Sequence, residues 1–360
     1  MTSEKYVGMD VHQASTSVAV LDSEGRIVFQ GLVRTRADAI QDFIRGLSGS
    51  VRVTFEEGTQ AQWLYEVIKP LVTEVVVCDP RKNKLLAAGN KGDRIDARKL
   101  AELLRGGQLK GVYHNSRDTK TLKQLEHNYS SIVGDCRRVM NRIKSLYRSQ
   151  AIPCPGPDVY NKRNRDQWLG RLTEPGLRTR AQFLFDELDS LRILRRTSKN
   201  VMLKEARSFD AYKILITVPT LGAVRSAVII AAVGSPHRFR TRRQFWTYCG
   251  LSVVTRSSDD YRFTEHGPIK RSRPPATRGL NRNFNRRLKH VFKSAAADGV
   301  KREPFKRFLR VREEAGIRRE MARLTLARKI ANITLTLWKN GDEFDEDRIK
   351  ENEFLKSVKS

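Results

Sequence analysis

The first part of the chain alternates apolar and polar positions in short runs, which is the pattern of half-buried strands. Residues 5–10 predict one strand, and residues 15–22 and 26–34 predict two more, with a turn at residues 23–25. Alternation over residues 51–56 predicts a fourth strand that ends at a glutamate. Polar side chains that close apolar strands are thereby placed at the edge of a sheet.

Helical spacing appears between and after these strands. Residues 37–47 and 63–71 carry apolar positions three and four apart, and residues 74–79 predict a fifth strand that Pro80 closes. Three early strands followed by strand–helix alternation predict a mixed α/β sheet.

The middle of the chain is helical by the same criterion. A helix is predicted over residues 93–105, and longer helical stretches cover about 117–150 and 176–208. Residues 153–158, rich in Pro and Gly, interrupt the two long stretches. We expect these stretches to pair as an antiparallel helical arm, for which a coiled coil is one possible form.

From about residue 212 the pattern predicts a second compact unit, mainly helical, with one hairpin near 252–264 and a last helix that ends near Trp338. The predicted fold class is therefore α/β plus α. The predicted domains are a mixed-sheet domain at 1–110, a helical arm at 111–210, a C-terminal domain at 211–340 and a polar tail at 341–360.

Charge narrows the choice of partner. The 360 residues carry 69 Lys and Arg against 40 Asp and Glu, a formal net charge of +29. Basic residues run through the predicted folded segments, which indicates nucleic acid rather than the alternative, a membrane surface. No apolar run approaches ~20 residues, so we expect no membrane span. The four cysteines lack metal-binding spacing and the chain opens on a strand without a signal peptide, which fits a reducing cytoplasm.

Against this basic background, a few carboxylates stand at informative places. Asp10 closes the first strand, Glu56 closes the fourth, and Asp93 and Asp96 lie three apart on one face of a helix. Carboxylates that lie as near to each other as this repel each other unless a cation lies between them. A divalent metal between these acids and phosphate would serve chemistry on a nucleic-acid backbone.

Ordinary structural roles remain open for the same acids. An Asp at a strand end is often a turn residue, and Asp93 fits a cap or a dipole partner at the start of its helix. Glu57 follows Glu56 directly and faces the other way if the strand continues, so it is an alternative to Glu56.

The order strand-Asp, strand-Glu and helical D-x-x-D resembles the RNase H-like fold of RuvC-type nucleases and transposases. The segments G-M-D-V-H at 8–12, F-E-E-G-T at 55–59 and N-K-G-D-R-I-D-A-R-K-L-A at 90–101 make this resemblance specific. The chain resembles the DEDD transposases of bacterial insertion sequences, the group described as bridge-RNA-guided recombinases. It departs from the usual family pattern at Gly92, where the family has Thr, and in E-E-G-T, where E-A-T-G is common.

The resemblance continues near the C-terminus. Residues 218–222 (VPTLG) resemble the family's helix-hairpin-helix segment, with Thr220 where a Gly is usual, and 243–251 (RQFWTYCGL) resemble a second family segment. By the same resemblance Ser258 matches the family's catalytic serine, with Ser257 as the alternative. Without the resemblance, Ser257 to Asp260 predict a polar turn, and Tyr261 is a weaker candidate nucleophile.

The resemblance implies a function that the residues alone leave open. It implies a transposase or recombinase in which Ser258 attacks a DNA phosphate beside Mg²⁺ held by Asp10, Glu56, Asp93 and Asp96. It also implies donor and target DNA, a structured guide RNA, a homo-oligomer (dimer or tetramer), and action in the bacterial cytoplasm with the nucleoid.

Two separate groups of basic residues predict nucleic-acid surfaces, because their cations greatly outnumber nearby acids. They are Arg137, Arg138, Arg142, Lys144 and Arg148 on the long helix, and Lys270, Arg271, Arg273, Arg278, Arg282, Arg286 and Arg287 in the C-terminal domain.

Two other functions fit the same residues. A hydrolytic nuclease or junction resolvase would use the carboxylates without a covalent intermediate. A non-enzymatic nucleic-acid-binding scaffold would use the acids only for structure.

Overall fold

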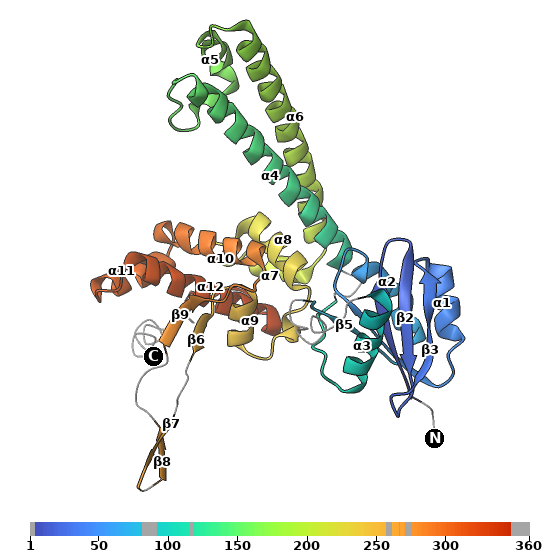
Figure 1. Cartoon of the computed structure of the whole chain (residues 1–360). Coiled ribbons are helices and arrows are strands. Elements are labelled where there is room, and N and C mark those ends of the chain that lie inside the picture. Colours follow the sequence, from blue (N-terminus) through green and yellow to red (C-terminus); the bar gives the residue numbers. More distant parts are fainter. Residues whose placement is uncertain are drawn as a thin grey trace. The chain divides into compact units, whose positions relative to one another are not determined.

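The computed structural model describes residues 4–80, 92–114, 119–256, 261–265, 267–270 and 276–346. By its internal contacts the chain divides into two compact units, residues 1–114 and 115–360. The first, blue to teal in Figure 1, holds the sheet, and the second is mainly helical.

The sheet of the first unit is mixed, as the sequence predicted. Its strands lie in the order β3-β2-β1-β4-β5. β1 pairs antiparallel with β2, which pairs antiparallel with β3, while β1, β4 and β5 run parallel. The bounds are β1 Glu4–Val11, β2 Ser15–Leu21, β3 Ile27–Arg34, β4 Ser50–Glu56 and β5 Glu74–Cys78.

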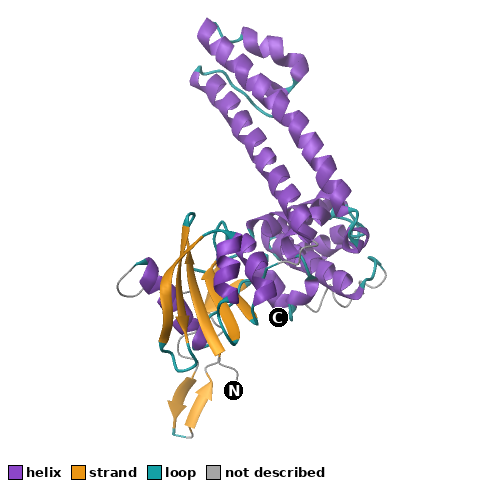
Figure 2. Cartoon of the chain, turned by 90° about the vertical axis from the view of Figure 1, so that its right-hand side faces the viewer, coloured by secondary structure: helices purple, strands orange, loops and turns teal. Residues whose placement is uncertain are grey.

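Helices cover both faces of this sheet (Figure 2). Val7 and Met9 of β1, with Phe55 of β4, pack against α1 (Ala37–Arg45) and α2 (Ala61–Ile68). The alternate positions face α3 (Asp93–Arg105). This topology is the RNase H-like arrangement that the resemblance implied, so that prediction is confirmed.

Gly8 sets how closely α3 approaches the sheet. A Cβ at this position would lie 2.1 Å from the carbonyl oxygen of Ala97 and 2.5 Å from the amide nitrogen of Ala101. Only a glycine allows the helix backbone to lie directly on β1. The start of α3 is thereby held beside the carboxyl end of β1.

The second unit contains the expected antiparallel arm (Figure 1). α4 (Lys120–Ser149) and α6 (Pro175–Ala206) pack along each other, and the short α5 (Arg165–Gly170) lies at their far end. Their shared core contains Ile143, Tyr147 and Leu188. Leu122 and Met202, at the other end of the arm, belong to the core of the C-terminal helices.

The C-terminal helices enclose that larger core, which includes Ile229, Phe292 and Leu326. They are α7 Asp210–Leu215, α8 Gly222–Val233, α9 Arg242–Tyr248, α10 Arg286–Asp298, α11 Phe305–Glu314 and α12 Arg319–Asn340. Short 3-10 helices lie at Lys69–Leu71, Asp158–Tyr160, Lys162–Asn164, Pro236–Arg238 and Gly299–Lys301. The predicted division into 1–110, 111–210, 211–340 and 341–360 stays a prediction.

The predicted hairpin near 252–264 is wrong in its pairing. β6 (Val253–Arg256) pairs antiparallel with β9 (Ala276–Leu280), and β7 (Tyr261–Thr264) pairs with β8 (Gly267–Lys270). The Ser/Asp-rich segment after β6 indicates a turn, but a turn signal does not specify which strands pair.

Candidate metal and nucleic-acid sites

Asp10 lies near the carboxyl end of β1, on the face that α3 covers. It is level with Ser17 of the antiparallel β2, and its side chain is 26% exposed. α3 begins at Asp93, so its first turn lies over this end of the strand. Gly8 lies two residues before Asp10 on the same face of β1. Because α3 packs on Gly8, the start of this helix lies close to the end of β1.

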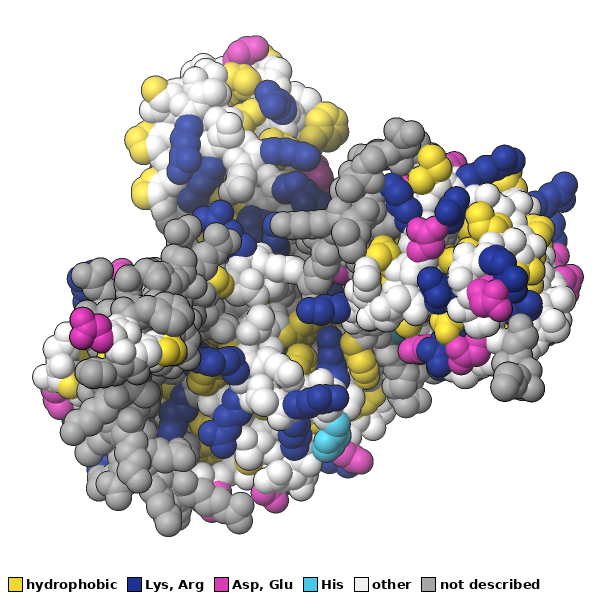
Figure 3. Space-filling view, turned by 60° about the horizontal axis from the view of Figure 1, so that its bottom comes forward, with side chains coloured by type: hydrophobic (Ala, Val, Ile, Leu, Met, Phe, Trp, Pro, Cys, Tyr) yellow, Lys and Arg dark blue, Asp and Glu magenta, His cyan; other side chains and the backbone are white. Residues whose placement is uncertain are grey.

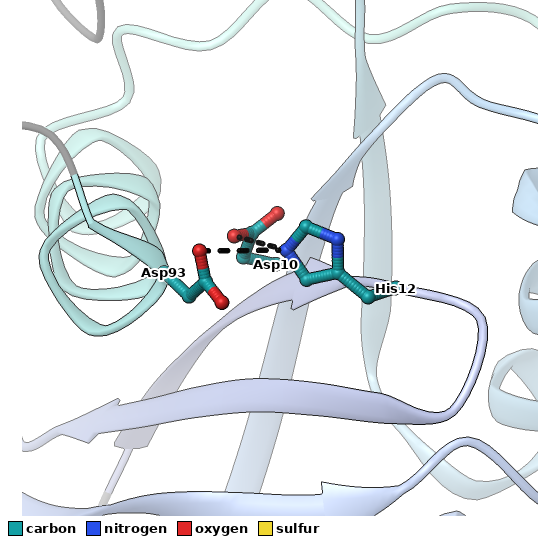
Figure 4. A group of neighbouring side chains, drawn as sticks. All are labelled: Asp10, His12 and Asp93. Carbon is teal, nitrogen blue, oxygen red and sulfur yellow. Dashed lines mark hydrogen bonds and ion pairs between the residues drawn. The ribbon is translucent and has the colours of Figure 1, made fainter.

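A histidine joins the two aspartates at this edge (Figure 4). Nε2 of His12 lies 3.1 Å from Oδ2 of Asp10 and 3.6 Å from Oδ1 of Asp93. The ligand atoms of Asp10, His12 and Asp93 all lie within 4.8 Å of one another. The spread of the group matches the reach of one small cation with two carboxylates and an imidazole around it.

The electrostatics of this edge disfavour a bare carboxylate. Burial raises the pKa of the Asp10 carboxyl, His12 lowers it, and the negative charges of Asp93 and Asp96 raise it further. A divalent cation would remove the repulsion among these acids and hold Asp10 in its ionised form.

Two buried oxygens on the elements that form this edge have no partner in the described part of the chain. Oδ1 of Asp96 is buried without a hydrogen bond, and so is the hydroxyl of Ser17. Buried polar atoms are normally paired, so each of them calls for an explanation. Metal coordination would give the carboxylate oxygen of Asp96 a partner, and the acids present therefore fit a divalent metal.

Glu56 ends β4, the neighbour of β1. The parallel register pairs Met9 with Phe55, so the next position along brings Glu56 level with Asp10 and onto the same face. Glu56 and His12 also line one hollow of about 530 Å³. Glu56 and Asp96 do not belong to the group of Asp10, His12 and Asp93, whose ligand atoms all lie within 4.8 Å of one another. Glu56 lies on the neighbouring strand β4, and Asp96 lies three residues after Asp93 in α3.

Glu57 is bound elsewhere. Its carboxylate lies 3.0 Å from Nε2 of His114, whose Nδ1 lies 3.0 Å from Oε1 of Gln62. The His114 ring stacks on Tyr65 at 4.8 Å between centroids, and its side chain is only 4% exposed. These contacts hold Glu57 toward α2, whereas Glu56 belongs to the face of Asp10.

The predicted nucleophile, Ser258, and its alternative, Ser257, lie outside the described residues. β6 ends at Arg256, directly before them, and β7 begins at Tyr261. The assignment of the serine therefore stays a prediction, as does the weaker alternative at Tyr261.

The basic residues of α4 divide into two sets. Arg138 pairs with Asp135, Arg142 lies 3.5 Å from Glu187, and Lys144 donates to the carbonyl oxygen of Gly156 at 2.7 Å. Arg148 is exposed, and Arg137 lines a groove at the base of the arm. Part of the predicted surface therefore stabilises the arm itself.

The second basic group lies partly outside the described residues. Arg271 and Arg273 fall there, and Lys270 and Arg278 are described only as strand positions in β8 and β9. Arg282 is exposed. Arg286 and Arg287 begin α10 and line the same groove as Arg137. The two predicted surfaces are thus not wholly separate.

The face of the molecule drawn in Figure 3 carries many basic side chains. On the face shown, Lys and Arg side chains are spread more widely than Asp and Glu. Among the helices that the structure describes, none combines the length and the apolar character that a membrane crossing requires.

Comparisons with known proteins agree with this arrangement. A family model described as "Transposase", of the DEDD type, matches residues 7–149, and a second, described as "Transposase IS116/IS110/IS902 family", matches residues 212–309. A protein of Sinorhizobium fredii (strain NBRC 101917 / NGR234) named "Putative transposase y4qE" is 27% identical over 273 residues. The aligned part covers 71% of this chain and 65% of that relative, a little under two thirds of its length.

Sequence reasoning missed several residues of these sites. His12 lies two positions after Asp10, so strand alternation could have placed it on the same face. Ser17 needed the antiparallel register, and Arg195 and Lys199 of the groove needed the packing of α6 against α4 and α8. Contacts between elements distant in sequence leave no local signal.

Proposed function

We propose that this chain, which belongs to the DEDD transposases of the IS116/IS110/IS902 family, cuts and exchanges DNA strands by phosphoryl transfer. The observation that carries the proposal is the group of Asp10, His12 and Asp93 at the sheet edge, with the unpartnered oxygen of Asp96 beside it. Acids placed this way in a chain of net charge +29 serve metal-dependent chemistry better than they serve folding.

Asp10, Glu56, Asp93 and Asp96 would hold Mg²⁺. The metal would supply positive charge that offsets the negative charge developing on phosphate and on the leaving oxygen. Asp10 and Glu56 would contribute from adjacent strands, and Asp93 and Asp96 would contribute from the first turn of α3. His12 orients Asp10 through its contact at 3.1 Å.

The chemical step follows from the resemblance. The hydroxyl oxygen of Ser258 forms a bond to a DNA phosphorus, and the bond from that phosphorus to the leaving sugar oxygen breaks. The hydroxyl proton leaves Ser258, and a proton completes the leaving hydroxyl group. The phosphoserine link conserves the energy of the broken bond for the later exchange.

The partners are proposed on the same ground. They are donor and target DNA, a structured guide RNA and further copies of this chain, in the bacterial cytoplasm with the nucleoid.

Metal binding is the direct test of the proposed site. Mn²⁺ titrated by electron paramagnetic resonance, with Mg²⁺ competition, is expected to bind the wild-type chain and to bind Asp10→Asn at least ~10-fold more weakly, since even outer-shell changes cost that much. Asp38→Asn, an exposed acid on α1, is the matched control and should bind like the wild type.

DNA cleavage separates the rival functions. Loss of Mg²⁺-dependent cleavage in Asp10→Asn supports the proposal, and unchanged nucleic-acid function in that variant supports a non-enzymatic scaffold. Cleavage that persists in Ser258→Ala supports the hydrolytic nuclease or junction resolvase.

A further inference from the structure

A groove of about 740 Å³ lies in the second unit where the base of the arm meets α8 and α10. Six Lys or Arg side chains and one acidic side chain, Glu126, line it. The cations come from four helices: Arg137 of α4, Arg195 and Lys199 of α6, Arg225 of α8, and Arg286 and Arg287 of α10. Elements far apart in the sequence thus direct positive charge to one place.

Two of the six cations are already engaged. Arg287 pairs with Glu126, and Arg225 lies 2.7 Å from Asp298 and donates to the carbonyl oxygen of Thr220. Within the described part of the chain, the side chains of Arg137, Arg195, Lys199 and Arg286 make no ion pair or hydrogen bond. Four unpaired cations around one groove leave a strong positive potential for an external anion.

The backbone adds to this potential. The first residues of α8, Gly222 to Val224, line the groove, and so do the first two residues of α10. Both helix N-termini carry partial positive charge, which attracts phosphate and repels cations. Arg286 in the first turn of α10 is therefore unfavourably placed unless an anion lies beside it.

Part of the lining of the groove is apolar. Val133, Leu221, Val224, Val228 and Val291 line it, together with the ring of Tyr129. The volume is that of a pocket for a small ligand and is too small to admit a duplex. Apolar and aromatic surface suits contact with bases, and the cations beside it suit contact with phosphates.

We infer that this groove binds an unpaired stretch of nucleic acid, with phosphates at Arg137, Arg195, Lys199 and Arg286 and bases over Tyr129 and the valines. The inference rests on the proposed function for its choice of partner. It joins residues of the two predicted basic surfaces into one site and adds Arg195 and Lys199 to them.

Fluorescence anisotropy of the full-length chain tests the inference. The probes are single-stranded DNA and RNA of about a dozen nucleotides, within the range that one single-strand-binding module covers, and a DNA duplex of the same length. Arg195→Gln, Lys199→Gln and Arg286→Gln should each weaken single-strand binding severalfold. Each should also lower the slope of log affinity against log salt by about 0.7.

Neighbouring cations supply matched controls. Arg196 adjoins Arg195 on α6, and Lys204 lies further along the same helix; both are exposed and neither lines the groove. Arg196→Gln and Lys204→Gln should keep wild-type affinity, and circular dichroism should show every variant folded. Equal losses in groove and control variants, or losses confined to the duplex, would overturn the inference.

The DNA and RNA arms identify which strand the groove takes. These binding measurements do not depend on whether the metal site is functional. If the groove variants lose single-strand binding and the wild-type chain does not cleave DNA, the inference about the groove stands and the proposed transposase function is rejected. If the wild-type chain cleaves DNA and all groove variants bind single strands normally, the proposed function stands and the inference about the groove is rejected.

Discussion

At the scale of single residues, the site depends on which glutamate faces which partner. Glu56 lies level with Asp10 in the parallel register, while Glu57 lies 3.0 Å from His114 and is held toward α2. One step along a strand reverses the face of a side chain, so the two neighbours serve different surroundings.

Paired substitutions test this division. Glu56→Gln should weaken Mn²⁺ binding, because the amide carries no negative charge. Glu57→Gln should leave Mn²⁺ affinity near the wild-type value and alter only the contact with His114. If Glu57→Gln lowers the Mn²⁺ affinity and Glu56→Gln does not, then Glu57 and not Glu56 is the metal ligand.

The same residues show how far sequence reasoning reached. Asp10 and Asp93 were predicted from a strand end and a helix start, and the structure brings their ligand atoms within 4.8 Å. Local patterns could not choose between Glu56 and Glu57, because the choice depends on His114 and on strand pairing. Whether the four acids act as the catalytic set stays a prediction.

At the scale of elements, the close packing of α3 on β1 creates the site. The helix carries Asp93 and Asp96 in its first turn, and Gly8 is where its backbone lies on the strand. Any side chain at this position pushes the helix, and the two aspartates with it, away from Asp10.

Gly8→Ala is therefore expected to damage both stability and metal binding. Its Cβ would lie 2.1 Å from a backbone oxygen, so relief requires movement of α3, at a cost of about 1–3 kcal/mol or more. Thermal unfolding and Mn²⁺ titration measure the two effects. Gly58→Ala, where no atom lies within 4 Å of the added Cβ, should change neither. Wild-type behaviour of Gly8→Ala would show that α3 does not depend on this contact.

Elements were easier to predict than their pairing. The limits of α3, predicted as 93–105, agree with Asp93–Arg105, and the antiparallel arm was expected from two long periodic stretches. The hairpin near 252–264 was wrong, because β6 pairs with β9, a strand separated from it by two others. Periodicity reports the type of an element, whereas pairing depends on distant partners.

At the scale of the whole molecule, the proposed chemistry needs residues from both compact units. The carboxylates belong to residues 1–114, and Ser258 belongs to residues 115–360. The proposal therefore requires that these parts, from one chain or from two, meet at one DNA phosphate during the reaction.

A phosphoprotein trap tests that requirement most directly. Purified protein with its co-purified RNA is incubated with end-labelled donor and target DNA in Mg²⁺, denatured and examined for label on protein. The account predicts label that disappears in Ser258→Ala and in Asp93→Asn but persists in Asp38→Asn. Cleaved DNA without protein-bound label, unaffected by Ser258→Ala, would contradict it.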